Sequence, residues 1–190
     1  MSEPLPRRIE NAATGDRMII LQSPLLGEGD ALIFRGILPG GAHGAPRHVH
    51  DGITETFHVE SGALEILLGH GRSRVLRPGE TIVIKPGMIH GFRNALDTET
   101  CFVTTADPGA ELEKFLRTVY RIGNAASAGT QGRLGAAFGF ARAMAETDMV
   151  LATIPRWLQR AVRSLAATIG SWWSPRSPAA DLARVSGLAR

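Results

Sequence analysis

Apolar and polar residues alternate through the first half of the chain with a period close to two, and turn residues interrupt this alternation about every eight to twelve positions. A period of two is typical of strands that bury one face, so this half is predicted to be an antiparallel sandwich or barrel. Nine short strands are expected, near residues 17–22, 30–38, 47–50, 54–60, 63–69, 72–77, 81–85, 89–94 and 99–105. Strands of this number and length close well as a double-sheet jelly roll.

The period changes after Asp107-Pro108-Gly109. From Ala110 to Ile122 apolar residues recur at steps of three and four, which predicts a helix with a left-handed stop at Gly123-Asn124. A small, polar loop is expected at residues 125–132, followed by a second helix over 134–154. The pattern therefore predicts a mainly β protein with a helical C-terminal extension.

A third helix is expected from Pro155 onward, because proline suits the first turn of a helix. Its apolar stripe contains Trp157, Leu165, Ile169 and Trp172, with arginines along the margin. Such a stripe fits a helix packed on the barrel or on a dimer partner, and it also fits an interfacial membrane helix. We expect packing on protein, with peripheral membrane contact as the alternative.

Net charge supports a division of the chain into three parts, an N-terminal arm or strand (1–29), a barrel (30–109) and a helical extension (110–190). Residues 1–110 carry ten basic and thirteen acidic side chains, whereas residues 111–190 carry eleven basic and five acidic ones. The basic residues of the extension are spaced at helical intervals without clustered aromatic stacking positions, which argues against nucleic-acid binding.

The first residues lack the apolar run of a signal peptide, and no uncharged stretch of about 18 residues or more could span a bilayer. Cys101 is the single cysteine of the chain, which agrees with a reducing compartment. The expected location is therefore the cytoplasm.

Four side chains suggest a metal site. His48 and His50 lie two apart on a predicted strand and so share a face, Glu55 opens the next strand, and His90 follows the turn at Pro86-Gly87. Imidazole nitrogens with one carboxylate suit a divalent transition metal, namely Fe, Ni, Mn, Cu or Zn, better than Ca²⁺ or Mg²⁺. A metal-free site with a histidine acting as acid or base is the alternative.

These residues resemble the two motifs of the cupin family. His48, His50, Glu55 and Gly62 fall on the first motif, whose leading glycine is displaced to Gly41. Gly79, Gly87, His90 and Asn94 fall on the second, although Lys85 stands where the family usually has proline and Pro86 lies one place later. The resemblance covers roughly residues 30 to 106 and implies a jelly-roll barrel, the ligand set named above and a homodimer.

Inward-facing residues would form the pocket around such a metal. Phe57, Phe92 and Arg35 are expected to contact a substrate, and Arg35 could hold a carboxylate. Strand register leaves two choices for another wall, either Cys101 and Val103 or Phe102 and Thr104. A largely apolar pocket fits an enol or phenol better than a phosphosugar.

Three functions remain open. The first is a dioxygenase-like oxidoreductase resembling quercetinase-like or acireductone-dioxygenase-like cupins, in which Glu55 could also act as general base. The second is a non-oxidative isomerase, lyase, cyclase or decarboxylase, and the third is a cupin that binds a small molecule or metal without catalysis. His43, His58 and His70 are expected at the surface or in loops, and Cys101 is expected to fill the core.

Overall fold

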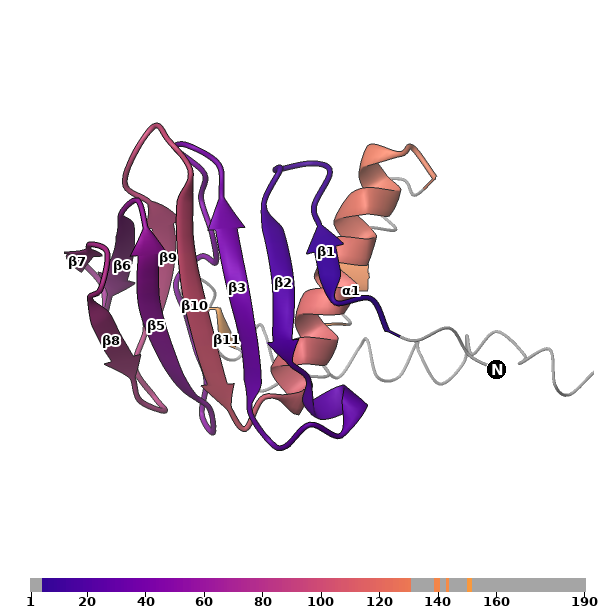
Figure 1. Ribbon diagram of the computed structural model, residues 1–190, viewed down its shortest axis with the longest axis horizontal. Helices are drawn as coiled ribbons and strands as arrows, with labels where there is room; N and C mark the ends of the chain where they lie inside the picture. Colours follow the sequence, from indigo (N-terminus) through magenta and orange to yellow (C-terminus); the bar gives the residue numbers. More distant parts are fainter. Residues whose placement is uncertain (1–4, 131–138, 141–142, 144–149, 152–190) are drawn as a thin grey trace, which may run out of the picture.

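Two antiparallel sheets face each other and form a jelly-roll barrel (Figure 1). The computed structural model describes residues 5–130, 139–140, 143 and 150–151. The larger sheet has the strand order β1 (Arg8–Glu10), β2 (Arg17–Gln22), β3 (Leu32–Leu38), β10 (Thr100–Asp107), β5 (Thr54–Ser61) and β8 (Thr81–Ile84). The smaller sheet has the order β11 (Val150–Leu151), β4 (His48–Val49), β9 (His90–Asn94), β6 (Leu64–Leu68) and β7 (Arg72–Leu76). A short 3-10 helix, η1 (Pro24–Leu26), links β2 to β3.

All nine predicted strands are present, and their ends lie within two residues of the expected ones. The alternation that predicted them is visible in their burial, since every second residue of β3 and β10 is buried. Strands β1 and β11 were not predicted. Both lie at the edges of their sheets and are only three and two residues long, too short for a period of two to show.

Two clusters of buried side chains fill the molecule. One lies within the barrel and includes Phe57, Leu64, Ile66 and Phe102. The other joins the β1–β2 end of the larger sheet to helix α1 (Ala110–Ser127) through residues such as Met18, Ile20, Leu112, Phe115 and Ala143. Helix α1 therefore packs against β1 and β2, at one end of the larger sheet, as Figure 1 shows.

The predicted end of this helix is wrong. The helix continues through Gly123 to Ser127, and the glycine with a left-handed φ is Gly129, at 70°. Asn124 lies inside the helix, and its side chain contacts the N-terminal strands: its Oδ1 accepts the backbone N–H of Ala12 at 2.7 Å and its Nδ2 donates to the Glu10 carbonyl at 2.8 Å. These two bonds attach the helix to the N-terminal strands.

A buried carboxylate fixes the other end of α1. Glu113 is fully buried and accepts hydrogen bonds from the Ser23 hydroxyl at 2.8 and 2.9 Å. Arg117, one helical turn later, lies 2.7 Å from the same carboxylate. The helix is thus joined to the segment around η1 by the buried Ser23–Glu113 hydrogen bonds, and the Glu113–Arg117 ion pair lies within the helix itself.

The extension beyond α1 differs from the prediction in one respect. Residues 139–140 and 143 are helical, within the expected second helix, but Val150 and Leu151 form strand β11 instead of continuing it. The expected third helix at 155–173, with its packing and membrane alternatives, lies outside the described residues. None of the helices in the described part is long and apolar enough to cross a membrane.

Candidate metal centre

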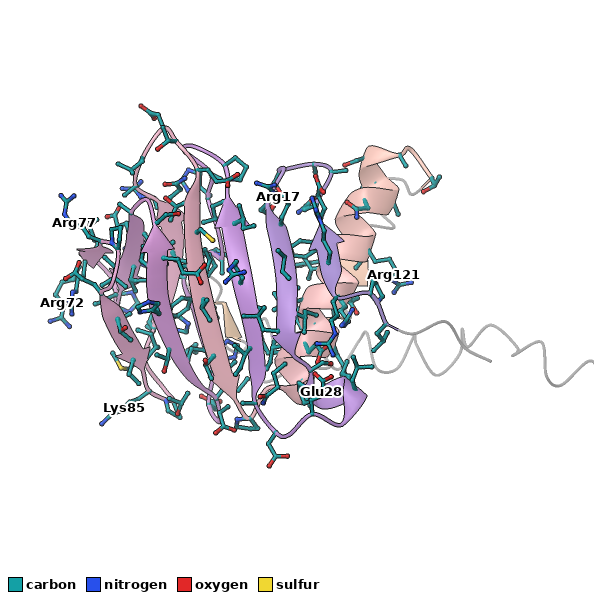
Figure 2. All side chains as sticks on the ribbon, in the orientation of Figure 1. Arg17, Glu28, Arg72, Arg77, Lys85 and Arg121 are labelled. Atoms are coloured by element: carbon teal, nitrogen blue, oxygen red, sulfur yellow. The ribbon has the colours of Figure 1, made fainter. Side chains whose placement is uncertain are left out.

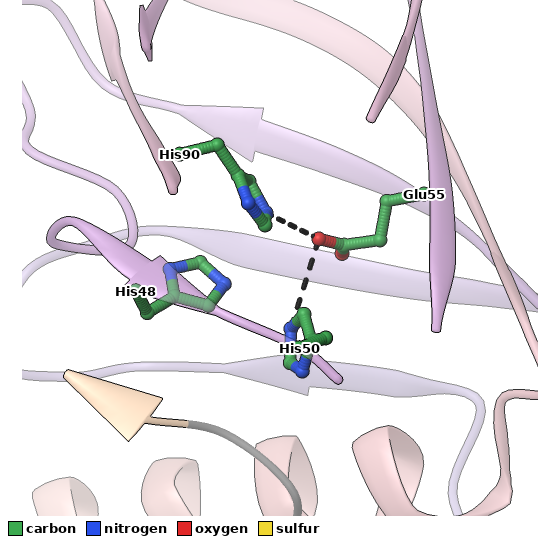
Figure 3. Close-up of side chains that lie close together, drawn as sticks. All are labelled: His48, His50, Glu55 and His90. Carbon is green, nitrogen blue, oxygen red and sulfur yellow. Dashed lines mark hydrogen bonds and ion pairs between the residues drawn. The ribbon is translucent and has the colours of Figure 1, made fainter. Parts of the chain in front are cut away.

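His48, His50, Glu55 and His90 converge inside the barrel from β4, β5 and β9 (Figure 3). One potential ligand atom from each residue lies within 4.8 Å of all the others. Each residue is at most 5% exposed. The sequence-based grouping of these four residues is therefore matched by the geometry.

Backbone pairing sets the positions of the three histidines. His48 and His90 are direct partners in the β4–β9 ladder. The turn before His90 is tied to the same region, because the Gly87 N–H donates to the His50 carbonyl at 2.8 Å and the Met88 N–H donates to Lys85 at 3.1 Å. The displaced proline of the second motif therefore leaves the turn and the ligand positions intact.

Contacts with backbone carbonyls determine which ring nitrogen of His48 and of His90 can bind a metal. His48 Nδ1 lies 2.8 Å from the Pro46 carbonyl oxygen, and His90 Nδ1 lies 3.0 Å from that of Met88. A carbonyl oxygen can only accept, so each Nδ1 carries a proton and each Nε2 has its lone pair directed elsewhere. This arrangement is the usual orienting contact of a metal-binding histidine.

The electrostatics of the site favour a bound cation. Burial raises the pKa of Glu55, but the close contact with His90 and the electrostatic influence of the surrounding imidazoles outweigh burial, so the net pKa lies below its usual value. Burial, followed by the neighbouring His90, lowers the pKa of His48 to about 4, so this imidazole is neutral at pH 7. The Glu55 carboxylate lies 2.5 Å from His90 Nε2 and 3.7 Å from His50 Nε2, as the dashed lines in Figure 3 show.

His90 Nε2 and the Glu55 carboxylate are both electron-pair donors once Nδ1 holds the imidazole proton. At 2.5 Å they would repel unless a proton or a metal ion lay between them. Three neutral imidazoles with one carboxylate form a donor set that fits a divalent transition metal and does not select one member of that series. The residues present therefore fit a metal site of the type the sequence predicts, with the identity of the metal open.

Aromatic rings form the wall next to the cluster. The Phe57 ring centre lies 6.3 Å from that of His90 and 5.5 Å from that of Phe92. Phe102 and Thr104 face inward on β10, which decides the register question left open by the sequence. The Phe102 ring meets the Phe92 ring edge to face, with their centres 5.4 Å apart. The sequence alone could not show that Phe102 and Thr104 face inward, because it does not reveal which face of β10 is buried.

Arg35 does not face the metal cluster, so its expected role in substrate binding is wrong. In β3 the buried residues are Leu32, Phe34, Gly36 and Leu38, which places Arg35 on the outer face of the sheet. Its guanidinium makes a bidentate pair with Glu60, through Nε at 2.7 Å and Nη2 at 2.8 Å. An arginine held in this way cannot reach a substrate inside the barrel.

Cys101 lies on that outer face as well and does not fill the core. Its thiol donates to Glu60 at 3.2 Å, and it pairs with Ile37 of β3 and Ser61 of β5. It is therefore neither a core residue nor a ligand. The remaining histidines, His43, His58 and His70, are exposed as expected.

The other motif residues have structural roles. Buried Asn94 donates from Nδ2 to the Pro39 and Thr98 carbonyls at 2.8 and 2.7 Å, and so ties two loops together. The motif glycines 41, 62, 79 and 87 all have positive φ. At Gly62 a Cβ would also lie 2.4 Å from Thr100 Oγ1, so a side chain would be excluded there twice over.

Comparison with known proteins identifies the family. Residues 34–106 match the sequence profile of the cupin domain family. Residues 34–106, which include the barrel strands from β4 to β9 and most of β3 and β10, therefore match a cupin domain. No curated protein sequence matches the chain.

Several solved structures are similar to the barrel. One is an uncharacterised conserved protein with a double-stranded β-helix domain from Klebsiella pneumoniae, at 22% identity and a TM-score of 0.46, over 57% of this chain and 92% of that one. Another is a cupin-like protein from Thermotoga maritima, at 17% identity and a TM-score of 0.48, over 56% and 82% of the two chains. A sugar phosphate isomerase of the cupin superfamily from Silicibacter pomeroyi has 26% identity and a TM-score of 0.45, over 56% and 67%.

Proposed function

We propose that this protein is a metal-dependent enzyme that acts on a small organic molecule, with an enol or phenol as the preferred substrate class and dioxygenase-like oxidation as the reaction. The observation that carries the proposal is the buried cluster of His48, His50, Glu55 and His90 beside an aromatic wall. Such a cluster needs a cation, and the neighbouring rings favour a planar, apolar ligand. When bound, a redox-active divalent ion supplies Lewis acidity and electron transfer to dioxygen.

The side chains around the cluster suit this substrate. Phe57 and Phe92 provide flat surfaces on which an aromatic or enolic ring can pack, and the absence of Arg35 from the wall removes the one cationic anchor expected there. The Thr104 hydroxyl is fully buried and has no hydrogen-bond partner among the described residues, so it can bind a substrate oxygen. Glu55, whose lowered pKa keeps it ionised, is placed to accept a proton from a substrate hydroxyl.

The test combines metal analysis with oxygen uptake. Protein purified without added metal is expected to contain about one transition-metal ion per chain and to consume dioxygen with at least one member of a panel of enols and catechols. The His48→Ala/His90→Ala double variant should lose both metal and uptake. A His58→Ala/His70→Ala variant, which removes two exposed histidines, is the matched control and should lose neither.

Each departure from this result has a definite meaning. Full metal retention by His48→Ala/His90→Ala overturns the metal site itself. Substrate conversion without oxygen uptake replaces the dioxygenase with an isomerase, lyase, cyclase or decarboxylase. If the protein binds metal and ligand but converts no substrate, it is a non-catalytic binding protein.

A further inference from the structure

The outer face of the smaller sheet carries a cavity that the metal centre does not use. Its volume is about 520 Å³, and its lining includes His43, Pro46, Arg47, Glu65, Arg72 and Arg93. This volume lies in the range of small-molecule pockets, roughly 300 to 1,000 Å³. We infer that this cavity is a second binding site, separate from the metal centre, for a small organic anion that bears a phosphate or a carboxylate group.

Strand alternation separates this cavity from the barrel interior. Glu65 of β6 pairs with Arg93 of β9, while the neighbours Leu64 and Ile66 are fully buried inside the barrel. Side chains of successive residues leave a strand on opposite faces. A ligand bound in the cavity that Glu65 and Arg93 line is therefore on the other side of the sheet from the metal cluster.

The cavity has an excess of positive charge. Three guanidinium groups line it, those of Arg47, Arg72 and Arg93, against the single carboxylate of Glu65. The hydrogen bond from Arg93, with Nε 2.6 Å from Oε2, is the main cause of a lowered pKa for Glu65, so this carboxylate is ionised and offsets one positive charge. Two positive charges remain, although residues 1–110 are net acidic.

Two of the arginines are held in place by the fold, and the third is at the rim. Arg93 is oriented by Glu65, and Arg47 Nε donates to the Gly69 carbonyl at 2.9 Å. Arg72 projects from the β7 edge of the barrel (Figure 2). Positioned guanidinium groups can bind carboxylate or phosphate oxygens in pairs of parallel hydrogen bonds, which explains the choice of ligand chemistry.

A small ligand fits this cavity better than a macromolecule does. The basic groups line one open pocket that also has an apolar side, formed by Pro46 and Leu67. An organic anion places its charged group against the arginines and its carbon skeleton against that apolar side. Residues 1–110 carry three more acidic than basic side chains, which disfavours a long polyanion.

Calorimetric titration of the full chain at low ionic strength tests the inference, with inorganic phosphate and succinate as the two probes. We expect saturable binding of at least one of them, and the stronger probe identifies phosphate or carboxylate as the preferred group. Arg72→Gln/Arg93→Gln should weaken binding by at least about tenfold, and Arg72→Gln alone by a smaller factor. Thermal melting of each variant verifies that it is folded.

The control is Arg74→Gln/Arg77→Gln, which removes the same charge from the same edge of the barrel but outside the cavity. It should change the affinity by less than about twofold. Equal weakening by both double variants, or no saturable binding at millimolar probe concentrations, overturns the inference. Titration of the His48→Ala/His90→Ala variant separates this site from the metal centre. The variant should bind the anion as the wild type does, and loss of binding would mean that the anion binds at the metal.

Discussion

At the scale of single residues, Glu55 contributes the one negative charge of the metal cluster. The carboxylate is buried and surrounded by three imidazoles, so its charge is little screened by water. Substitution by glutamine keeps the size and one potential ligand oxygen but removes that charge. This makes Glu55 the residue at which charge and shape can be tested separately.

We predict that Glu55→Gln lowers the affinity for a divalent transition metal by at least about tenfold, which corresponds to about 1.4 kcal/mol. Competition with a chromophoric chelator measures the affinity. Glu60→Gln, on the outer face of the same strand, is the control and should leave the affinity unchanged. A metal affinity equal to that of the wild type would show that Glu55 is not a ligand.

Cys101 gives a second prediction at this scale. Burial, together with its hydrogen bond to Glu60, raises the pKa of this thiol to about 11. Since the thiolate is the reacting form, alkylation by iodoacetamide at pH 8 should be about 100-fold slower than in the unfolded chain and should rise steeply up to pH 11. Glu60→Gln should speed it up at pH 8. Rapid alkylation of the folded wild-type protein would contradict the position assigned to Cys101.

Arg35 shows where sequence reasoning stops at this scale. The alternation in β3 was predicted correctly, but its phase was not, because apolar residues occupy both faces: Leu32 and Phe34 on one, Ile33 and Ile37 on the other. Only the partner strands show which face is inside. The four metal ligands escaped this difficulty, since their identity as imidazoles and a carboxylate sets them apart from any core residue.

At the scale of secondary structure elements, α1 depends on polar contacts as much as on its apolar stripe. Leu112 and Phe115 were predictable from their spacing, and both are buried against the N-terminal strands. The Ser23–Glu113 and Glu10–Asn124 hydrogen bonds were not predictable, because their partners lie 90 and 114 positions apart in the sequence. Periodicity identifies an element, whereas its ends are set by the partners it meets.

We predict that Glu113→Ala destabilises the protein by about 3 to 5 kcal/mol, because the Arg117 charge is then left buried without its partner. Urea unfolding measures this change. Glu111→Ala, in the same helical turn but exposed and paired with Lys114 at the surface, should change the stability by less than about 1 kcal/mol. Similar losses for the two variants would mean that the buried pair has no special role in attaching α1.

At the scale of the whole molecule, both sheets end in strands with exposed apolar side chains. Val75 of β7 is 44% exposed and Val83 of β8 is 49% exposed. Both strands are at sheet edges, where backbone groups can pair with another chain. This arrangement is consistent with the homodimer that the sequence suggested.

We therefore predict a dimer of the full-length chain, with light scattering giving about twice the mass of 20.3 kDa at micromolar concentration. Val83→Lys should weaken the dimer if β8 lies in the interface, and Val75→Lys should weaken it if β7 does. A monomeric mass for the wild type would refute the prediction, whichever edge is considered.

Strand β11 has a consequence for how the protein avoids sticking to itself. It pairs with β4 through Val150 with Val49 and Leu151 with His48, and β4 is bonded to β9 on its other side. Without Val150 and Leu151, β4 would be the free edge of its sheet, and an unpaired edge is a template on which foreign strands assemble into aggregates. The extension thus covers the backbone edge of the segment that carries His48, so proteolytic loss of residues 150–151 should free this edge and promote strand-to-strand association next to the metal cluster.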